Sequence, residues 1–334
     1  MISRARSRHI QRTAIEEHFH GLRRGLAFDV FAAIEQHGVQ LVFAPLQRLY
    51  GAYVPGERPG IMISSSHPQA LQRYTAAHEL GHHLLHREEY SLDGKAEIAS
   101  GSGSGSGSDS EREAQLFAGQ LLMPPFTVAA AMRQVGARNN GGITAPHVYE
   151  MSGLLGVSYS AMVHTLAGLH HINRSEQARL LAVRPKIIKA DLAFGTNPAR
   201  TAHVWAVRGP DAVDLSATTV GDEVAVELPE NRTTGHRWFA RTDGDAVEPS
   251  FDRYVSGRSS GEEVRIGAGG RRQLIIAINE PGSWSVRLAY SPAHRRDRPI
   301  EQIELTGTSR VPAGIDHANS YVRRFLEAEQ RGDQ

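Results

Sequence analysis

The chain has 334 residues, 40% hydrophobic and 22% charged, which fits an ordinary globular protein long enough for two domains. Its 37 Lys and Arg balance 36 Asp and Glu, which excludes a global field toward nucleic acid or an anionic membrane. It has no cysteine, so disulfides, thiolate zinc sites and a cysteine nucleophile are excluded. No signal-peptide core and no stretch as long as a membrane span occurs, so we expect a cytoplasmic protein.

The N-terminal part of the chain predicts a helix, a small sheet and a second helix. Apolar residues at helical spacing predict the first helix over Thr13 to His37, with Gly38 after its end. Three short runs rich in β-formers follow and predict a small antiparallel sheet. They span Val39 to Phe43, Tyr50 to Val54 and Gly60 to Ser64. Ser66 to Gln69 resembles a capping box, and the pattern after it stays helical to about His86.

A strict Gly-Ser alternation occupies residues 100–108, and this composition is typical of a flexible linker. Its regularity indicates an engineered replacement of a natural loop. Helical periodicity resumes at Glu111 and ends at Met123, before two prolines. Further helices are predicted over Ala145 to Leu155, Tyr159 to Leu169 and Arg174 to Leu181.

From about Val204 the hydrophobic period changes to that of strands, which predicts a separate all-β unit. The predicted strands span Val204 to Val207, Glu223 to Glu227, Arg237 to Arg241, Val264 to Ile266, Gln273 to Ile278 and Trp284 to Tyr290. Helical signals end between Lys189 and Asn197. We therefore expect domains at residues 1–190 and 198–310, followed by a segment 311–334 with a helix over about Asn319 to Gln330.

The second predicted helix carries the segment His78-Glu79-Leu80-Gly81-His82. Residues four apart project from one face of a helix, one turn apart, so His78 and His82 can share one metal ion. Glu79 is not placed to join both histidines as a ligand. Its carboxylate can instead take a proton from water that the ion has acidified. We therefore expect a hydrolytic zinc site with Glu79 as general base.

A catalytic zinc keeps three protein ligands, so one more is required. The candidates are His83, His86, Glu88, Glu89, Glu111 and Glu113. His86 is about 12 Å along the helix axis from His78, which is too far to share one ion. Glu111 and Glu113 are about 200° apart around a helix, so only one of them can face the metal. We choose Glu113, which shares its face with Phe117, and keep Glu111 as the alternative.

Two segments together resemble the ImmA/IrrE family of metallopeptidases, over roughly Thr13 to Ala182. They are His78 to His86, and Glu111 to Ala118 with the following Leu121 to Pro124. The resemblance implies a zincin-like α+β fold with a helical extension at about residues 140–190, a Zn²⁺ cofactor, and a ligand role for Glu113. It also implies cleavage of a helix-turn-helix repressor in stress, phage-related or defence gene control. Gln115 departs from the asparagine usual in that family.

Val148 to Leu155 and Tyr159 to Leu169, joined through Gly156-Val157-Ser158, have the spacing of a helix-turn-helix, with Ser158 as N-cap of the second helix. The segment from Tyr159 to Leu166 carries no Lys or Arg, whereas a recognition helix needs cations for phosphates and donors for bases. We therefore favour packing or repressor docking for this pair over direct DNA binding.

Three predicted loops in the β unit resemble those of chagasin-type inhibitors of papain-like cysteine peptidases, over about Val204 to Thr306. Their residues include Thr233, Thr234, Gly235, Gly269 and Arg298, which we take as candidates for partner binding. The resemblance implies an all-β immunoglobulin-like sandwich. Three departures from the usual residues of that family argue against inhibition of a cysteine peptidase. Arg232 stands where the family usually has proline, His236 where it has an aromatic residue, and Ile300 where it has tryptophan.

The sequence as a whole favours a zinc-dependent endopeptidase that makes site-specific regulatory cuts in a repressor. The competing hypothesis is a non-enzymatic sensor or binding protein that acts through its β unit or through DNA. Bound zinc and cleavage that depends on Glu79 distinguish the two.

Overall fold

The computed structural model describes residues 2–89, 91–94, 108–138, 142–208, 215–256 and 269–312. The chain divides into a first unit, residues 1–180 with 312–334, and a second unit, residues 181–311. Three predicted segments lie outside the described residues: nearly all of the Gly-Ser stretch, the strand at 264–266 and the C-terminal helix at 319–330. Among the described helices, none is both long and apolar enough to cross a membrane.

The N-terminal helix is shorter and earlier than predicted. Helix α1 spans Arg4–His20, and a ribbon of β1, Arg23–Arg24, and β2, Ala27–Phe28, separates it from α2, Val30–Gln36. The predicted continuous helix over Thr13 to His37 is therefore wrong. Gly25 at φ 56° makes the turn of the ribbon, and the Asp29 carboxylate caps α2 by accepting from Ala32 N.

The sheet of the first unit is mixed. Its strands are β3, Gln40–Ala44; β4, Leu49–Val54; β5, Gly60–Ser64; and β6, Ser91–Gly94, in the order β3-β5-β4-β6. β4 pairs antiparallel with β5 and β6, but β3 pairs parallel with β5, which corrects the predicted antiparallel sheet. The chain passes from β3 to β4 and returns through a hairpin, so β5 enters between them.

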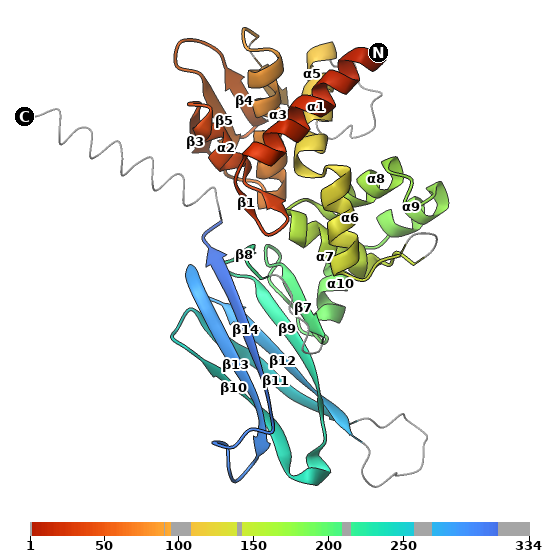
Figure 1. Cartoon of the computed structure of the whole chain (residues 1–334). Helices are drawn as coiled ribbons and strands as arrows, with labels where there is room; N and C mark the ends of the chain where they lie inside the picture. Colours follow the sequence, from red (N-terminus) through yellow and green to blue (C-terminus); the bar gives the residue numbers. More distant parts are fainter. Residues whose placement is uncertain are drawn as a thin grey trace, which may run out of the picture. The chain divides into compact units, whose positions relative to one another are not determined.

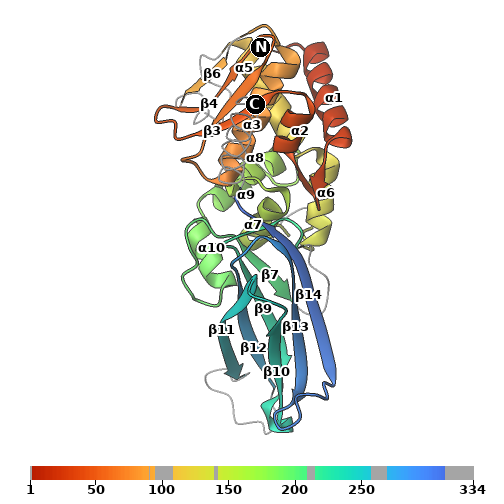
Figure 2. The ribbon, with the colours of Figure 1, turned by 90° about the vertical axis from the view of Figure 1, so that its left-hand side faces the viewer.

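Helix α3, Gln69–Leu85, packs on β4 and β5 and also on α5, Asp109–Leu122 (Figures 1 and 2). The predicted capping box is absent, because Pro68 occupies the N-cap position and no side chain caps the helix. A Cβ atom at Gly81 would lie 3.1 Å from Phe117 Cδ1 and 3.2 Å from Ala114 Cα. A small residue at position 81 therefore lets α3 and α5 approach closely.

The remaining helices of the first unit follow the predicted pattern with one addition. They are α6, Pro125–Gln134; α7, Ala145–Leu155; α8, Tyr159–Gly168; and α9, Arg174–Leu181. Helix α6 begins at the second of the two prolines that were expected only to end a helix; proline suits a first helical position. Ser158 caps α8 as predicted, because its Oγ accepts from Ala161 N at 3.2 Å.

The described residues of the second unit contain one α-helix, α10, Pro185–Leu192, a short 3-10 helix, Arg232–Thr234, and two four-stranded sheets. One sheet has the order β10-β13-β14-β8 and the other β11-β12-β9-β7. The strands are β7, Val204–Arg208; β8, Thr218–Thr219; β9, Glu223–Glu230; β10, His236–Thr242; β11, Val247–Ser256; β12, Gly270–Ile278; β13, Gly282–Pro292; and β14, Glu301–Arg310. Sequence patterns missed α10, β8, β11 and β14.

Buried side chains from both sheets form the core of the second unit. Trp238, Val286 and Leu288 come from one sheet, and Val224 and Ile276 from the other. The indole Nε1 of Trp238 donates to Pro229 O at 2.8 Å, which ties β10 to the end of β9. The two units therefore have the expected classes at a coarse level: helices with a sheet in the first unit, and mainly β-sheet in the second.

Candidate metal centre

The two histidines of the motif converge as predicted. His78 and His82 lie one turn apart on α3, and their Nε2 atoms are 3.1 Å apart. Both side chains are buried, with exposed fractions of 1% and 2%. Two ring nitrogens held this close repel each other unless a proton or a cation lies between them.

Glu111, and not Glu113, completes the cluster. Glu111 Oε2 lies 3.1 Å from His78 Nε2, and Glu111 Oε1 lies 3.4 Å from His82 Nε2. Among the described residues, these three form the one group of His and carboxylate side chains that could hold a metal ion. The choice of Glu113 as third ligand is thus replaced by Glu111, which the sequence had kept as the alternative.

Glu113 binds different partners. Its Oε2 accepts hydrogen bonds from Arg6 Nη2 at 2.6 Å and Arg6 Nε at 2.9 Å, and lies 3.2 Å from His86 Nε2. These contacts tie α5 to α1 and to the end of α3. Sequence patterns could not foresee this, because Arg6 is 107 residues from Glu113 in the chain.

The three side chains fit a zinc ion. Ligand atoms about 2.0–2.1 Å from one zinc, at tetrahedral angles, lie about 3.4 Å from one another. His78 Nε2 lies 3.1 Å from both His82 Nε2 and Glu111 Oε2, and His82 Nε2 lies 3.4 Å from the other oxygen of Glu111, Oε1. Two imidazoles and one carboxylate are also a ligand set of catalytic zinc sites, which leaves the fourth position open.

The Glu111 carboxylate stays ionised in this cluster. Burial by itself raises the pKa of Glu111, but hydrogen bonds and charge interactions with His78 and His82 outweigh burial. Together they hold the pKa of Glu111 far below its usual range. A negative ligand is therefore present at neutral pH.

Glu79 lies beside the cluster and is fully buried. It follows His78 on α3 and faces strand β4, where a Cβ atom at Gly51 would lie 3.0 Å from Glu79 Oε1. A carboxylate so placed, one residue from a metal ligand and outside the ligand set, suits proton transfer.

His83 and His86, which the sequence left without a role, lie outside the ligand set. His83 Nδ1 is 3.1 Å from the hydroxyl of Tyr53, which donates to Arg87 O at 3.0 Å. Burial lowers the pKa of both histidines. Tyr53 therefore supports α3, and Arg6 supports α5. Sequence patterns singled out neither of them.

The candidate partner-binding residues gather at one end of the second unit. Strand pairing places Gly270 opposite Glu230, His236 opposite Pro292, and Glu301 opposite Tyr290. The connections next to these pairs therefore lie at the same end of the strands. They carry Thr233, Thr234, Gly235, Gly269 and Arg298.

The turn between α7 and α8 is fixed to helix α3. The guanidinium of buried Arg73 on α3 donates to Gly156 O at 2.9 Å and to Phe28 O at 2.6 Å. Gly156 has φ 63°, a conformation that favours glycine. The turn of the helix pair thus packs on the rest of the first unit, which favours a packing role for this pair.

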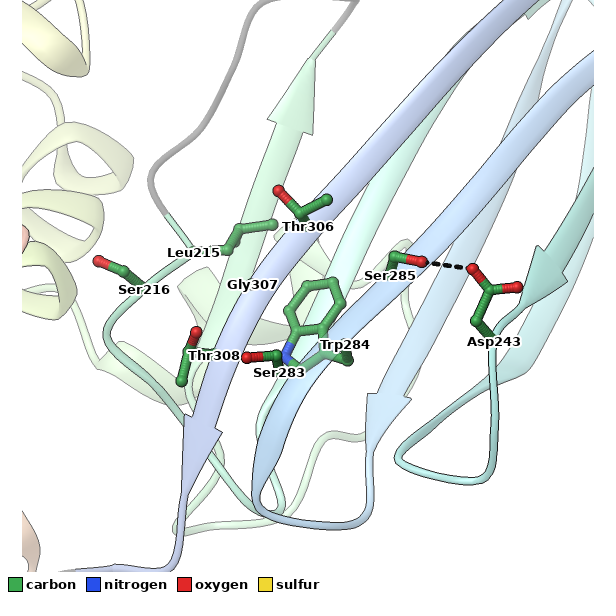
Figure 3. A pocket seen from close by; sticks show the side chains of 9 residues that line it. All are labelled: Leu215, Ser216, Asp243, Ser283, Trp284, Ser285, Thr306, Gly307 and Thr308. Carbon is green, nitrogen blue, oxygen red and sulfur yellow. Dashed lines mark hydrogen bonds between the residues drawn. The ribbon is translucent and has the colours of Figure 1, made fainter.

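The second unit has a cavity of about 680 Å³ that no sequence pattern predicted (Figure 3). It is lined by Leu215, Ser216, Asp243, Ser283, Trp284, Ser285, Thr306, Gly307 and Thr308. Ser285 Oγ donates to Asp243 Oδ2 at 2.7 Å, as the dashed line in Figure 3 marks. The lining has hydroxyl groups and one carboxylate but no Lys, Arg or His.

Comparison with known families agrees with this division. Residues 34–167 match the model of the IrrE N-terminal-like domain of peptidase family M78, and residues 217–306 match the chagasin family of peptidase inhibitors, I42. One segment of the chain is thus similar to IrrE N-terminal-like domains and a later segment to chagasin-family inhibitors. The IrrE-like domain contains all three metal-ligand candidates and Glu79, and the chagasin-like domain contains the loop residues named above.

Solved structures with some similarity include inhibitors and one regulator. The cysteine protease inhibitor EhICP2 from Entamoeba histolytica is 20% identical over 32% of this chain and 96% of its own, with a TM-score of 0.28. Amebosin is 16% identical over 32% of this chain and 96% of its own, with a TM-score of 0.25. A Mycobacterium tuberculosis transcriptional regulator is 13% identical over 83% of this chain and 77% of its own, with a TM-score of 0.30. No curated protein matched the chain.

Proposed function

We propose that the first unit is a zinc-dependent endopeptidase. The observation that carries this proposal is the convergence of His78, His82 and Glu111 at the spacing of zinc ligands, with buried Glu79 beside them. The match to a peptidase family over residues 34–167 supports the same reaction class. When bound, zinc supplies Lewis-acid chemistry that polarises a carbonyl group and acidifies water.

Two histidines and two glutamates of this chain have separate roles in the proposed reaction. His78 and His82 would hold the ion through neutral Nε2 atoms and Glu111 through a negative oxygen, so a bound Zn²⁺ would keep one net positive charge. Glu79 takes a proton from the attacking water on a carboxylate oxygen and passes it to the leaving amine nitrogen as the peptide C–N bond breaks. Burial of Glu79 excludes bulk water from this transfer.

The substrate proposed for this activity is a helix-turn-helix repressor, cut at one site in stress, phage-related or defence gene control in the cytoplasm. This proposal rests on the family resemblance of the first unit. The α7–α8 pair serves packing or repressor docking in this scheme, because α8 carries no Lys or Arg for phosphate contacts.

The proposed role of the second unit is recognition of a protein partner or substrate. Its support is the gathering of Thr233, Thr234, Gly235, Gly269 and Arg298 at one end of the strands. Exposed loops on a rigid sheet scaffold are common binding surfaces. Arg232, also at this end, lies over the ring of Tyr254 at 3.9 Å, so its guanidinium is held in a fixed position.

The test compares new N-termini by mass spectrometry in cells that express the wild type or Glu79→Gln, together with a repressor. We expect Glu79→Gln to keep zinc and lose cleavage, and His82→Ala to lose both. A Glu79→Gln protein that cleaves as well as the wild type would refute the mechanism. Wild-type protein without zinc and without cleavage would favour the non-enzymatic sensor.

A further inference from the structure

Strand β4 comes close to helix α3 at Gly51. A Cβ atom built at this position would overlap Thr75 Cγ2 and lie 3.0 Å from both Glu79 Oε1 and Met62 O. Thr75 and Glu79 are one turn apart on α3, and both are buried, with exposed fractions of 1% and 0%. Thr75 and Glu79 thus pack against the β4 backbone where any other residue at position 51 would place its side chain.

Backbone conformation does not explain the glycine. Gly51 is not among the glycines with positive φ, so an L-residue can adopt its backbone angles. The pairing of β4 with β6 is irregular between Leu49 and Gly51, whereas Gly51 stays in register with Ile63 of β5. A bulge of this kind bends a strand locally and is common beside active sites. The space toward Thr75 and Glu79 is therefore the feature that requires glycine.

We propose that Gly51 is a positioning residue for Glu79: the missing side chain at this strand position fixes where the Glu79 carboxylate lies. The inference rests on the proposed peptidase function, in which Glu79 transfers the proton. A methyl group at position 51 displaces the carboxylate by some tenths of an ångström or turns it away from the reacting water. The three atoms nearest to that Cβ belong to Thr75, Glu79 and Met62, and none belongs to His78, His82 or Glu111.

The experiment uses the full chain and separates this contact from general packing. Gly51→Ala is made in two backgrounds, wild type and Thr75→Ala, because Thr75→Ala removes the overlapping methyl group and protects folding. Gly60→Ala is the matched control: it lies on neighbouring β5, and its Cβ would meet only Gln40 O, at 3.7 Å. Zinc per chain and the thermal unfolding midpoint are measured for every variant.

Two further readouts report on the Glu79 carboxylate. One is kcat and KM for a peptide that spans the cleavage site. The other is the Kd of acetohydroxamate, a zinc chelator whose N–H and O–H groups can donate to a neighbouring carboxylate. We expect Gly51→Ala/Thr75→Ala to lower kcat about 10-fold to 100-fold relative to Thr75→Ala, with KM and zinc content unchanged. Acetohydroxamate should bind about 3-fold to 10-fold more weakly. Gly60→Ala should match the wild type.

A double-mutant cycle with Glu79→Asp decides whether the effect passes through Glu79. The aspartate side chain is one methylene shorter, so Gly51→Ala should change kcat and acetohydroxamate affinity less than about twofold in the Glu79→Asp background. The proposal would be overturned if Gly51→Ala changed kcat and acetohydroxamate affinity equally with Glu79 and with Asp at position 79. It would also be overturned if Gly51→Ala/Thr75→Ala had the same kcat and acetohydroxamate affinity as Thr75→Ala alone.

The outcomes also separate the inference from the proposed function. Protein that binds zinc and shows the acetohydroxamate effect but cleaves no peptide supports the positioning role and refutes the peptidase. Protein that cleaves but shows additive effects in the cycle supports the peptidase and refutes the positioning role. A wild-type chain that binds no zinc refutes both.

Discussion

Exchanging each glutamate of α5 in turn tests the geometry of the metal centre. Glu111→Gln keeps the shape of the side chain but removes the negative oxygen that lies 3.1 Å from His78 Nε2. Loss of a residue next to a metal ligand typically costs 10-fold to 100-fold in metal affinity, so loss of a charged ligand should cost at least about 100-fold, or about 2.7 kcal/mol. Glu113→Gln breaks only the contacts with Arg6 and His86. It should cost at most about tenfold in zinc affinity.

The assay is competition for Zn²⁺ against a chelator of known affinity at fixed pH, with thermal unfolding of the zinc-free variants as the second measurement. Glu113→Gln should lower the stability of the zinc-free protein by about 0.5–1 kcal/mol, because Arg6 is partly exposed and water screens its ion pair. Glu111→Gln should also lower that stability at neutral pH, since the contacts of Glu111 with His78 and His82 outweigh the cost of burying its charge. A larger loss of zinc affinity in Glu113→Gln than in Glu111→Gln would refute the assignment.

Three other predictions follow from the packing. Gly81→Val should destabilise the first unit by about 1–3 kcal/mol in urea unfolding and weaken zinc binding, because α3 and α5 touch at Gly81; unchanged zinc affinity would contradict this. Burial lowers the pKa of His18 below its ordinary value of about 6.5. As pH falls through that value, His18 is protonated in the unfolded chain before it is protonated in the folded chain. The free energy of unfolding should therefore fall as pH falls from 7 to 5. His18→Gln should flatten that fall, and an identical pH dependence would be evidence against it. Trp238→Ala should destabilise the second unit by about 3–5 kcal/mol in calorimetry, because the side chain is buried. Zinc affinity, measured by chelator competition, should stay the same. A loss of zinc affinity would show that zinc binding depends on the stability of the second unit.

The placement of His78 and His82 on one face of α3 was predictable because its signal is local. Two histidines four residues apart share one helix face whatever the rest of the fold does. The third ligand was not predictable, because it depends on how α5 rotates against α3. Glu113 points to Arg6, on a helix whose position the sequence does not reveal. Glu113 and Phe117 are both buried, but Glu113 contacts Arg6 of α1 and His86 at the end of α3. Glu111 contacts His78 and His82 instead.

The errors in the fold have a similar cause. The apolar spacing over Thr13 to His37 continues past the end of α1, because Phe19 and Leu22 fit the helical period. Their side chains are nevertheless 55% and 58% exposed, so they do not mark a buried helix face. Strands β11 and β14 alternate with many polar residues, so their patterns are weaker than those of β12 and β13. The parallel pairing of β3 with β5 is a matter of strand order, which residue preferences do not determine.

Zinc-edge anomalous diffraction from crystals of the zinc-loaded protein tests the metal centre most directly. The account predicts one peak about 2.0–2.2 Å from His78 Nε2, His82 Nε2 and a carboxylate oxygen of Glu111, with Glu113 still bound to Arg6. A peak coordinated by Glu113, or no peak between the two histidines in zinc-loaded crystals, would contradict it.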